Sequence, residues 1–179
     1  MRASTSSTLM SGAVSAAPDP QGIAVGGASL IPTIRIQHRH DDNIFSSDIL
    51  EESSTITNLT PRLEYYAERD DQNFLSVTYD GDYARYWDSR DDDYEDHTLS
   101  ILGAYSGNDF FRLRADASTA QLHDNRGEGA SEGISTIFRD ETDQYDRVQA
   151  GLFLDFGRQT SRFGFSLEAR TIEIEYTTN

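Results

Sequence analysis

The sequence contains no cysteine and no lysine, and all 15 of its basic residues are arginine. Without cysteine the chain forms no disulfide, no thiol nucleophile and no thiolate metal site. Apolar runs are only a few residues long, so the sequence predicts no membrane-spanning helix. The 31 acidic residues leave a formal charge of -16, which argues against nucleic acid as a partner, because nucleic acid binds basic surfaces.

The first 28 residues do not resemble a folded domain. The segment is rich in Ser, Ala, Thr and Gly, and Ala13–Ala17 has the small residues of a signal-peptide cleavage site. An apolar signal core is missing, since Leu9 and Met10 form the main apolar patch before that site. We therefore expect residues 1–28 to be a flexible leader, with a truncated secretion signal as the alternative, and residues 29–179 to form the folded part.

Between residues 30 and 170 the sequence alternates between apolar and polar residues in seven segments. In residues 75–84, for example, the odd positions are Leu, Val, Tyr, Gly and Tyr, whereas the even positions are Ser, Thr, Asp, Asp and Ala. A period of two is the period of a β-strand, whereas an amphipathic helix needs apolar residues three and four positions apart. The pattern predicts an all-β fold in which each strand has one apolar and one polar face.

The connections between these segments alternate between long and short. Long connections follow the first, third and fifth segments (residues 40–54, 88–97 and 121–144), so successive hairpins place every long loop at one end of the sheet. Aromatic residues gather at the two strand ends: Tyr65, Phe74, Tyr105, Phe110, Phe111, Phe156 and Phe163 near the short turns, and Tyr83, Tyr86, Trp87, Tyr145 and Tyr176 near the long loops. This arrangement is typical of an antiparallel up-and-down transmembrane β-barrel, which we predict here. The alternative is a soluble β-sandwich.

Charged residues occupy the polar face of several segments. In a dry core each unpaired charge would be strongly destabilising, whereas a wet barrel interior keeps such charges hydrated and allows ion pairs across strands. The residues expected to line this lumen are Arg35, Arg62, Glu64, Asp80, Asp82, Arg112, Arg114, Asp116, Glu168 and Arg170. Seven strands do not close a barrel of this kind, so we expect the chain to form part of a larger barrel.

Two short motifs are similar to segments of a known family. The first is Asp41-Asp42-Asn43-Ile44-Phe45, directly after the first segment, and the second is Tyr79-Asp80-Gly81-Asp82-Tyr83 in the third. With these motifs the chain resembles the N-terminal part of the outer-membrane β-barrel porin-2 type family, over Leu30 to Tyr176. The resemblance implies an outer-membrane barrel of a Gram-negative bacterium, with a transport role linked to exopolysaccharide or capsule export.

Other groups of residues give weaker evidence for a binding or catalytic site. Two acidic groups, Asp91–Asp93 with Glu95 and Asp96, and Asp140 and Glu141 with Asp143, are expected to be solvated loops. Ca²⁺ binding is their alternative, although the spacing of an EF-hand loop is absent. His38, His40, His97 and His123 are scattered near the long loops, and no Ser, His and acid share the spacing of a hydrolase. We therefore expect no cofactor and no enzymatic activity.

The favoured function is a passive or partner-gated conduit through the outer membrane. Its expected partners are membrane lipid and lipopolysaccharide, together with components of polysaccharide export. One alternative is a structural or adhesive surface barrel that acts through its acidic loops, among them residues 127–132. A soluble all-β binding domain is a further alternative, and a membrane-embedded hydrolase has the least support.

Overall fold

The computed structural model describes residues 22–45, 51–108, 110–124, 143–157 and 163–177 of the chain. These residues form β-strands and one short 3₁₀ turn, η1 (Arg90–Asp92), and no α-helix occurs among them. The strands are β1 (Ile23–Val25), β2 (Ala28–Asp41), β3 (Ser54–Asp70), β4 (Asn73–Tyr86), β5 (Tyr94–Asn108), β6 (Phe111–His123), β7 (Gln144–Phe156) and β8 (Phe165–Tyr176). In this described part no helix has the length and apolarity required to cross a membrane.

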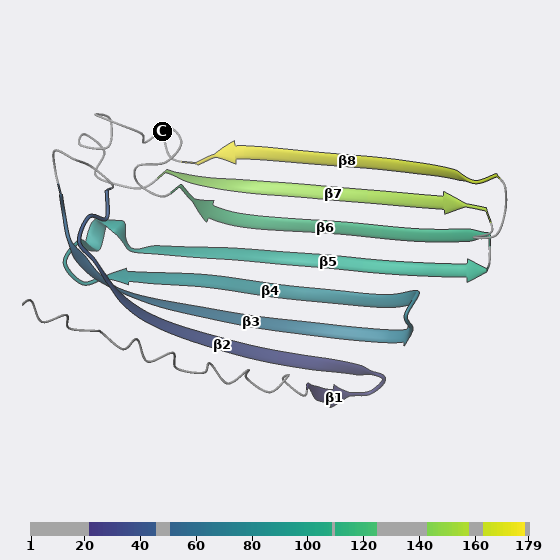
Figure 1. Ribbon diagram of the computed structural model, residues 1–179, viewed down its shortest axis with the longest axis horizontal. Coiled ribbons are helices and arrows are strands. Elements are labelled where there is room, and N and C mark those ends of the chain that lie inside the picture. Colours follow the sequence, from purple (N-terminus) through teal and green to yellow (C-terminus); the bar gives the residue numbers. More distant parts are fainter. Residues whose placement is uncertain (1–21, 46–50, 109, 125–142, 158–162, 178–179) are drawn as a thin grey trace, which may run out of the picture.

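Every strand pairs with its neighbours in the sequence. The eight strands form one sheet in the order β1 to β8, and each neighbouring pair is antiparallel. Figure 1 shows the β2–β3, β4–β5 and β6–β7 connections at one end of the sheet, which we call the loop end, and the other connections at the opposite turn end. The predicted up-and-down topology is thus confirmed. The sheet is not closed, because β1 and β8 are its two edges.

The sheet contains eight strands rather than the seven expected. The additional strand is β1: Ile23–Val25 lies inside the segment expected to be a leader and pairs with Ala28–Leu30 at the start of β2. Three residues are too few to show a period in the sequence, which is why this strand was not foreseen. The other strands run from 12 residues in β8 to 17 in β3, which exceeds the length of about 9–11 residues that a tilted strand needs to cross a bilayer.

Glycine and Asp side chains shape the turn end. Gly26 has a φ of 64°, a conformation that suits the two-residue hairpin between β1 and β2 and that residues with a Cβ rarely adopt. In the β3–β4 turn the carboxylate of Asp70 accepts the side-chain amide of Asn73 at 2.6 Å and the N–H of Gln72 at 3.0 Å. These donors stabilise the ionised carboxylate, so they lower the pKa of Asp70 below its ordinary value.

The sheet has almost no apolar core. Among the described residues the buried apolar side chains are Ile56, Ala84 and Ala120. Large apolar side chains lie open instead: Ile34 is 69% exposed and Leu152 is 41% exposed. A single sheet buries neither of its faces by itself, and an apolar face of this extent is stable only against another apolar phase.

Candidate functional site

The strand register sorts the side chains onto two faces. Residues directly opposite each other in antiparallel strands point to the same side. In one such row Leu63 lies opposite Tyr79, and Tyr79 lies opposite Leu99. We call this side the apolar face; its residues include Ile34, Ile36, Leu59, Leu63, Leu75, Val77, Leu99, Ile101, Leu113, Leu152, Leu154 and Leu167. The opposite side is the charged face.

All ten residues predicted to line a lumen lie on the charged face: Arg35, Arg62, Glu64, Asp80, Asp82, Arg112, Arg114, Asp116, Glu168 and Arg170. The guanidinium of Arg62 lies 2.9 Å from Asp80 on β4 and 3.4 Å from Glu64 on its own strand. The Arg62 and Asp80 side chains are 46% and 42% exposed, so water reaches both. Two further ion pairs on this face join Arg112 to Asp155 and Arg170 to Glu168. That this face lines a lumen stays a prediction.

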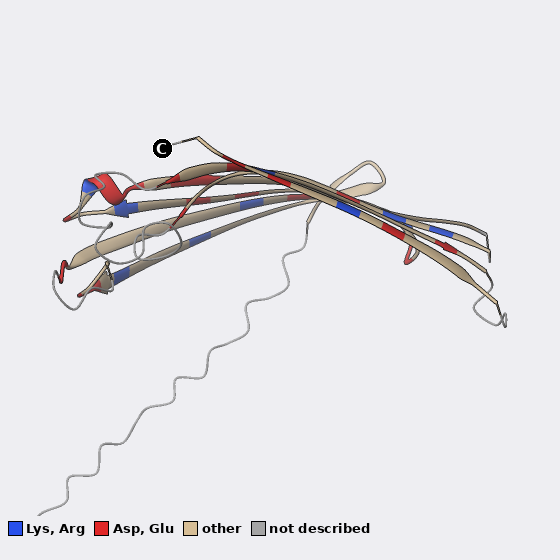
Figure 2. Cartoon of the chain, turned by 90° about the horizontal axis from the view of Figure 1, so that it is seen from above, with Lys and Arg blue, Asp and Glu red and all other residues tan. Residues whose placement is uncertain are grey.

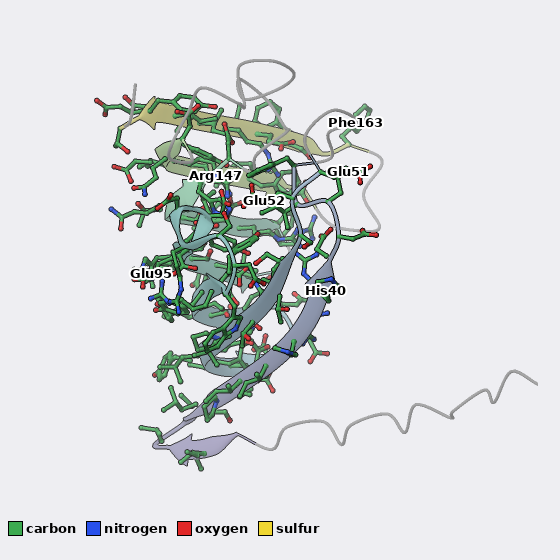
Figure 3. The ribbon with its side chains drawn as sticks, turned by 90° about the vertical axis from the view of Figure 1, so that its left-hand side faces the viewer. His40, Glu51, Glu52, Glu95, Arg147 and Phe163 are labelled. Atoms are coloured by element: carbon green, nitrogen blue, oxygen red, sulfur yellow. The ribbon has the colours of Figure 1, made fainter. Side chains whose placement is uncertain are left out.

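The charged face is the concave side of the sheet. Seen from the loop end, the tips of β2 and β3 near Glu51 and Glu52 curl toward one side, and Glu95 projects on the other (Figure 3). Glu95 belongs to the apolar face, since it lies opposite Tyr83. The buried side chains Ile56 and Ala84 both lie on the charged face, opposite Tyr86 and Tyr94. Near the loop end, side chains on the concave side therefore bury Ile56 and Ala84, whereas many large apolar side chains on the convex side remain uncovered.

Charge is unevenly distributed along the sheet. Figure 2 shows acidic and basic residues spread along the strands, with acidic residues crowded toward the loop end. This end carries Glu51 and Glu52 before β3, the acidic η1 turn, and Glu173 and Glu175 at the end of β8. The loop end is therefore the more negative of the two ends.

The apolar residues form a band across the sheet. The edge of this band that lies nearer the loop end, which we call its upper edge, runs obliquely to the rows of directly opposed residues. One row of directly opposed residues runs across the sheet in the order Ile34, Pro61, Gly81, His97, Gln121, Asp146 and Glu175. This row is apolar on β2 and β3 and becomes polar from β5 onward. The edge of the band therefore shifts toward the turn end from β2 to β8.

The slope of this edge gives a strand tilt. The edge lies at Ile36 on β2 and at Thr171 on β8. Measured along the strands, Thr171 lies about 20 Å closer to the turn end than the hydrogen-bonded row that contains Ile36. The strand spacings between β2 and β8 cover about 29 Å across the sheet. An edge that lies level in a membrane therefore requires strands tilted by about 35° from the membrane normal, within the range of transmembrane barrels.

Gly81 explains the spacing of the second sequence motif. A Cβ at this position would lie 2.8 Å from the Tyr83 ring and 3.1 Å from the Tyr79 hydroxyl, so only glycine lets both rings close over the backbone. The two hydroxyls then lie 3.0 Å apart, and the Tyr79 hydroxyl lies 2.8 Å from Nδ1 of His97. The motif thus builds a hydrogen-bonded aromatic cluster on the apolar face, near the upper edge of the band.

The two motifs lie at different heights on the sheet: Asp41 of the first lies opposite Ser54 at the loop-end tip of β3, whereas Tyr83 of the second lies opposite Leu59, five positions further along that strand. Asp41 of the first motif accepts the N–H of Asn43 at 3.2 Å and pairs with Arg39 at 3.1 Å. Burial raises the pKa of Tyr86, and Asp41 and Asp82 add to this effect. Only the first motif therefore lies at the loop-end tip of the sheet, above the apolar band.

A cluster of polar and aromatic side chains lies on the charged face toward the loop end of β3 to β6. The amide of Asn58 donates to Asp82 at 3.3 Å and to the Tyr94 hydroxyl at 3.1 Å. The Tyr94 ring stacks on His123 with a centroid distance of 3.7 Å, and His123 Nδ1 lies 2.9 Å from Asp96. Burial raises the pKa of Tyr94 to about 12, and the charge of Asp82 contributes to the rise. These bonds fix the side chains that surround the loop end of the charged face.

The structure does not bring the four histidines together. His38 and His40 lie on β2 and contact Thr57 and Thr55, whereas His97 contacts Tyr79 on another strand. No group of three or more His, Asp or Glu side chains with the geometry of a metal site occurs within the described ranges.

Two carboxylates of the acidic β4–β5 connection form hydrogen bonds with neighbouring groups of the chain. Asp93 accepts the backbone N–H of Tyr86 at 2.7 Å and the guanidinium of Arg85 at 3.3 Å, and Ser89 donates to the buried Asp92. Part of the second acidic group, Asp140 and Glu141, and the loop of residues 127–132 lie outside the described residues.

Several aromatic residues lie on a different face from that of a membrane belt. Tyr145 lies opposite both Leu122 and Tyr176, on the charged face, and Phe74 lies opposite Glu68 there. Phe111, Phe156 and Phe165 form the row on the apolar face at the turn end, and the Phe111 and Phe156 rings lie 5.1 Å apart. The predicted positions along the strands are correct, but only part of the aromatic residues faces outward.

Three carboxylates on the apolar face were not foreseen from the sequence. Val148 lies opposite Glu173, and Asp146 lies opposite Glu175, so the end of β8 points its acidic residues outward. Ile172 and Ile174 point to the charged face instead, opposite Gln149 and Arg147. The signal that could have revealed this is the period of two counted onward from Leu167 and Ala169, although the hydropathy of residues 172–175 alone suggests the reverse.

These features define a class of protein. The antiparallel sheet is curved, with ion pairs on its concave face and an uncovered apolar band on its convex face, and such a sheet is the wall of a transmembrane β-barrel. The family described as "Putative beta-barrel porin 2" matches residues 16–179. The chain therefore belongs to this porin family, as the two motifs suggested. No curated protein and no solved structure matches the chain.

Proposed function

We propose that the chain forms part of the wall of a water-filled conduit through the outer membrane of a Gram-negative bacterium. The charged face lines the lumen and the apolar face contacts the acyl chains. The observation that supports this role is the Arg62–Asp80 pair, whose two side chains stay about half exposed on the concave face while the convex face carries the uncovered apolar band. Half-exposed ion pairs of this kind tolerate water and contribute little to stability, so their role is to shape the field in the lumen.

The conduit acts by selective permeation. Rows of guanidinium and carboxylate groups on the lumen wall attract solutes of one sign and repel those of the other. On the described strands three ion pairs join charges of the lumen face, whereas the loop end is acidic, so a solute that passes the loop end meets a negative mouth there. The natural solute of this proposal is an exported polysaccharide, and its partners are lipopolysaccharide and components of a polysaccharide export system.

The test is the electrical behaviour of the purified full-length protein in planar lipid bilayers. Asp80→Arg replaces a lumen carboxylate by a cation and separates Arg62 from its partner, so the ratio of cation to anion permeability is expected to fall. Gln121→Arg places the same charge on the apolar face and serves as the control, with an unchanged ratio expected. Absence of any conductance, or an equal effect of the two substitutions, would contradict the proposal.

A soluble binding domain fits these observations less well. Its apolar face would need a second sheet or a helix as cover, yet Ile34, Leu99 and Leu152 are uncovered. An adhesive role of the acidic loops is tested by deleting residues 127–132: loss of surface binding with unchanged conductance would favour it. We propose no catalytic role.

A further inference from the structure

A groove lies on the charged face over β2 to β4, in the half of β2 that is nearer the loop end. Its volume is about 360 Å³, and its lining residues are Arg35, Gln37, Arg39, Asn58, Thr60 and Asp82. These side chains carry two guanidinium groups, two amides, one hydroxyl and one carboxylate. The lining of this groove is therefore cationic, although the chain as a whole is strongly acidic.

The strand register keeps two opposite charges of the groove apart. Arg35 on β2 lies opposite Thr60 on β3, so β3 stands between Arg35 and Asp82 on β4. Arg62 and Asp80, by contrast, lie directly opposite each other on neighbouring strands and form an ion pair at 2.9 Å. In the part of the chain that the structure describes, neither Arg35 nor Asp82 has an ion-pair partner. Both charges thus remain available to a ligand.

Hydrogen bonds hold the Asp82 carboxylate in place. Its Oδ1 accepts the amide of Asn58 at 3.3 Å, and its Oδ2 accepts the Tyr94 hydroxyl at 3.3 Å. An ionised carboxylate accepts about four hydrogen bonds, so Asp82 can accept about two more. Sugar hydroxyl groups are suitable donors for these positions. The Arg35 guanidinium has donors only, and their fork matches a carboxylate.

We propose that the groove binds an acidic sugar unit of a polysaccharide, with its carboxylate on Arg35 and its hydroxyl groups donating to Asp82. This inference rests on the proposed function, because it names the class of solute that the lumen face recognises. The backbones of Arg35 and Asp82 are two strand spacings apart, about 10 Å, a span that a disaccharide bridges. A neutral sugar would leave Arg35 without a partner, and an anion without hydroxyl groups would only be repelled by Asp82. The two charges together select a ligand that carries both kinds of group.

The test is isothermal titration calorimetry of the full-length protein in detergent micelles with three soluble probes. Digalacturonate carries carboxylates and hydroxyl groups, the corresponding disaccharide of galactose carries hydroxyl groups alone, and succinate carries carboxylates alone. Digalacturonate is expected to bind about fivefold more tightly than the neutral disaccharide, which is the effect of one exposed ion pair. It is also expected to bind more tightly than succinate, which offers no hydroxyl donor to Asp82.

Two substitutions separate the groove from the net charge of the chain. Arg35→Gln is expected to remove the fivefold preference for digalacturonate over the neutral disaccharide. Arg69→Gln removes the same charge at the turn end of β3 and is expected to retain the preference. In planar bilayers digalacturonate is expected to interrupt the current through the parent protein and through Arg69→Gln at lower concentrations than through Arg35→Gln.

Three results of the titration would overturn the inference. Equal affinities for digalacturonate and the neutral disaccharide mean that the groove does not recognise a carboxylate. Succinate bound as tightly as digalacturonate means a general anion site. An equal loss of preference in Arg35→Gln and Arg69→Gln means that the overall charge, and not the groove, sets the affinity.

The two measurements also separate this inference from the proposed function. A protein that conducts ions but shows no preference for digalacturonate is a conduit without this site, and the inference fails alone. A protein that shows the preference and its dependence on Arg35, but does not conduct, has the site without the conduit, and the proposed function fails.

Discussion

The tilt of the strands predicts that two positions in one hydrogen-bonded row differ in their depth in the membrane. Leu63 on β3 and Val148 on β7 belong to the same row, through Tyr79, Leu99 and Thr119. With a tilt of about 35°, the strand spacings between them place these residues at depths that differ by about 11 Å. Leu63 then lies near the centre of the band, and Val148 lies at its upper edge.

The two positions should therefore respond differently to the same substitution. An Arg at the bilayer midplane of a β-barrel costs about 2–4 kcal/mol of folding free energy, and one near the interface costs about 0–1 kcal/mol. Leu63→Arg is expected to reach the higher range and Val148→Arg the lower. Their side chains are 42% and 51% exposed, so lost packing contributes about equally at both sites.

The measurement is the urea-dependent unfolding equilibrium of the full-length protein in phospholipid vesicles, followed by the fluorescence of Trp87, the single tryptophan of the chain. Leu63→Ala and Val148→Ala separate the loss of the apolar side chain from the cost of the charge. Equal costs for the two Arg variants, or a higher cost at Val148, would refute both the tilt and the assignment of this face to lipid.

The remaining predictions concern the backbone, the turn end and the lumen face. Gly81→Val should lower the free energy of unfolding by about 1–3 kcal/mol, because the valine side chain would collide with the Tyr79 and Tyr83 rings. Gly103→Val should lower it clearly less in the same urea titration, because the nearest atoms lie 3.7 Å from a Cβ added there. Ionised Asp70 stabilises its turn, because its pKa is lower in the folded state than in the unfolded state. This stabilisation is complete above the ordinary pKa of the carboxyl and is lost as the pH falls through the lowered value. Asp70→Asn should remove this part of the acid sensitivity, and an unchanged dependence of the unfolding free energy on pH would contradict the assignment. Arg112→Gln leaves Asp155 without its ion pair, and because both side chains are partly shielded the cost should be about 1 kcal/mol, against no change if the pair is fully solvated.

The sequence predicts the two faces well because side-chain direction in a strand is a local property. Each residue follows its neighbour with a period of two, so ten charged residues could be assigned to one face before any pairing was known. The topology was also accessible, since loop lengths alternate in a regular order. Neither property depends on contacts between distant parts of the chain.

The end of β8 shows where hydropathy, unlike side-chain direction, fails to identify the face. Residues 171–176 alternate as regularly as the rest, but the apolar Ile172 and Ile174 lie on the charged face and the acidic Glu173 and Glu175 on the apolar face. Hydropathy identifies the face that meets lipid only inside the band, and above it the relation reverses. The period of two counted onward from Leu167 and Ala169 gives the correct face, and the register with β7 agrees with it. The position of Tyr145 and Tyr176 on the charged face was missed for the same reason.

The separation of charges from apolar residues also protects the pairing of the strands during assembly. If β3 shifted by one position relative to β2, Arg62, Glu64 and Glu68 would turn toward the acyl chains. A single arginine at the midplane already costs about 2–4 kcal/mol, so a hairpin with this error would be expelled from the bilayer before the next strand is added. The lipid itself thus rejects incorrectly paired intermediates.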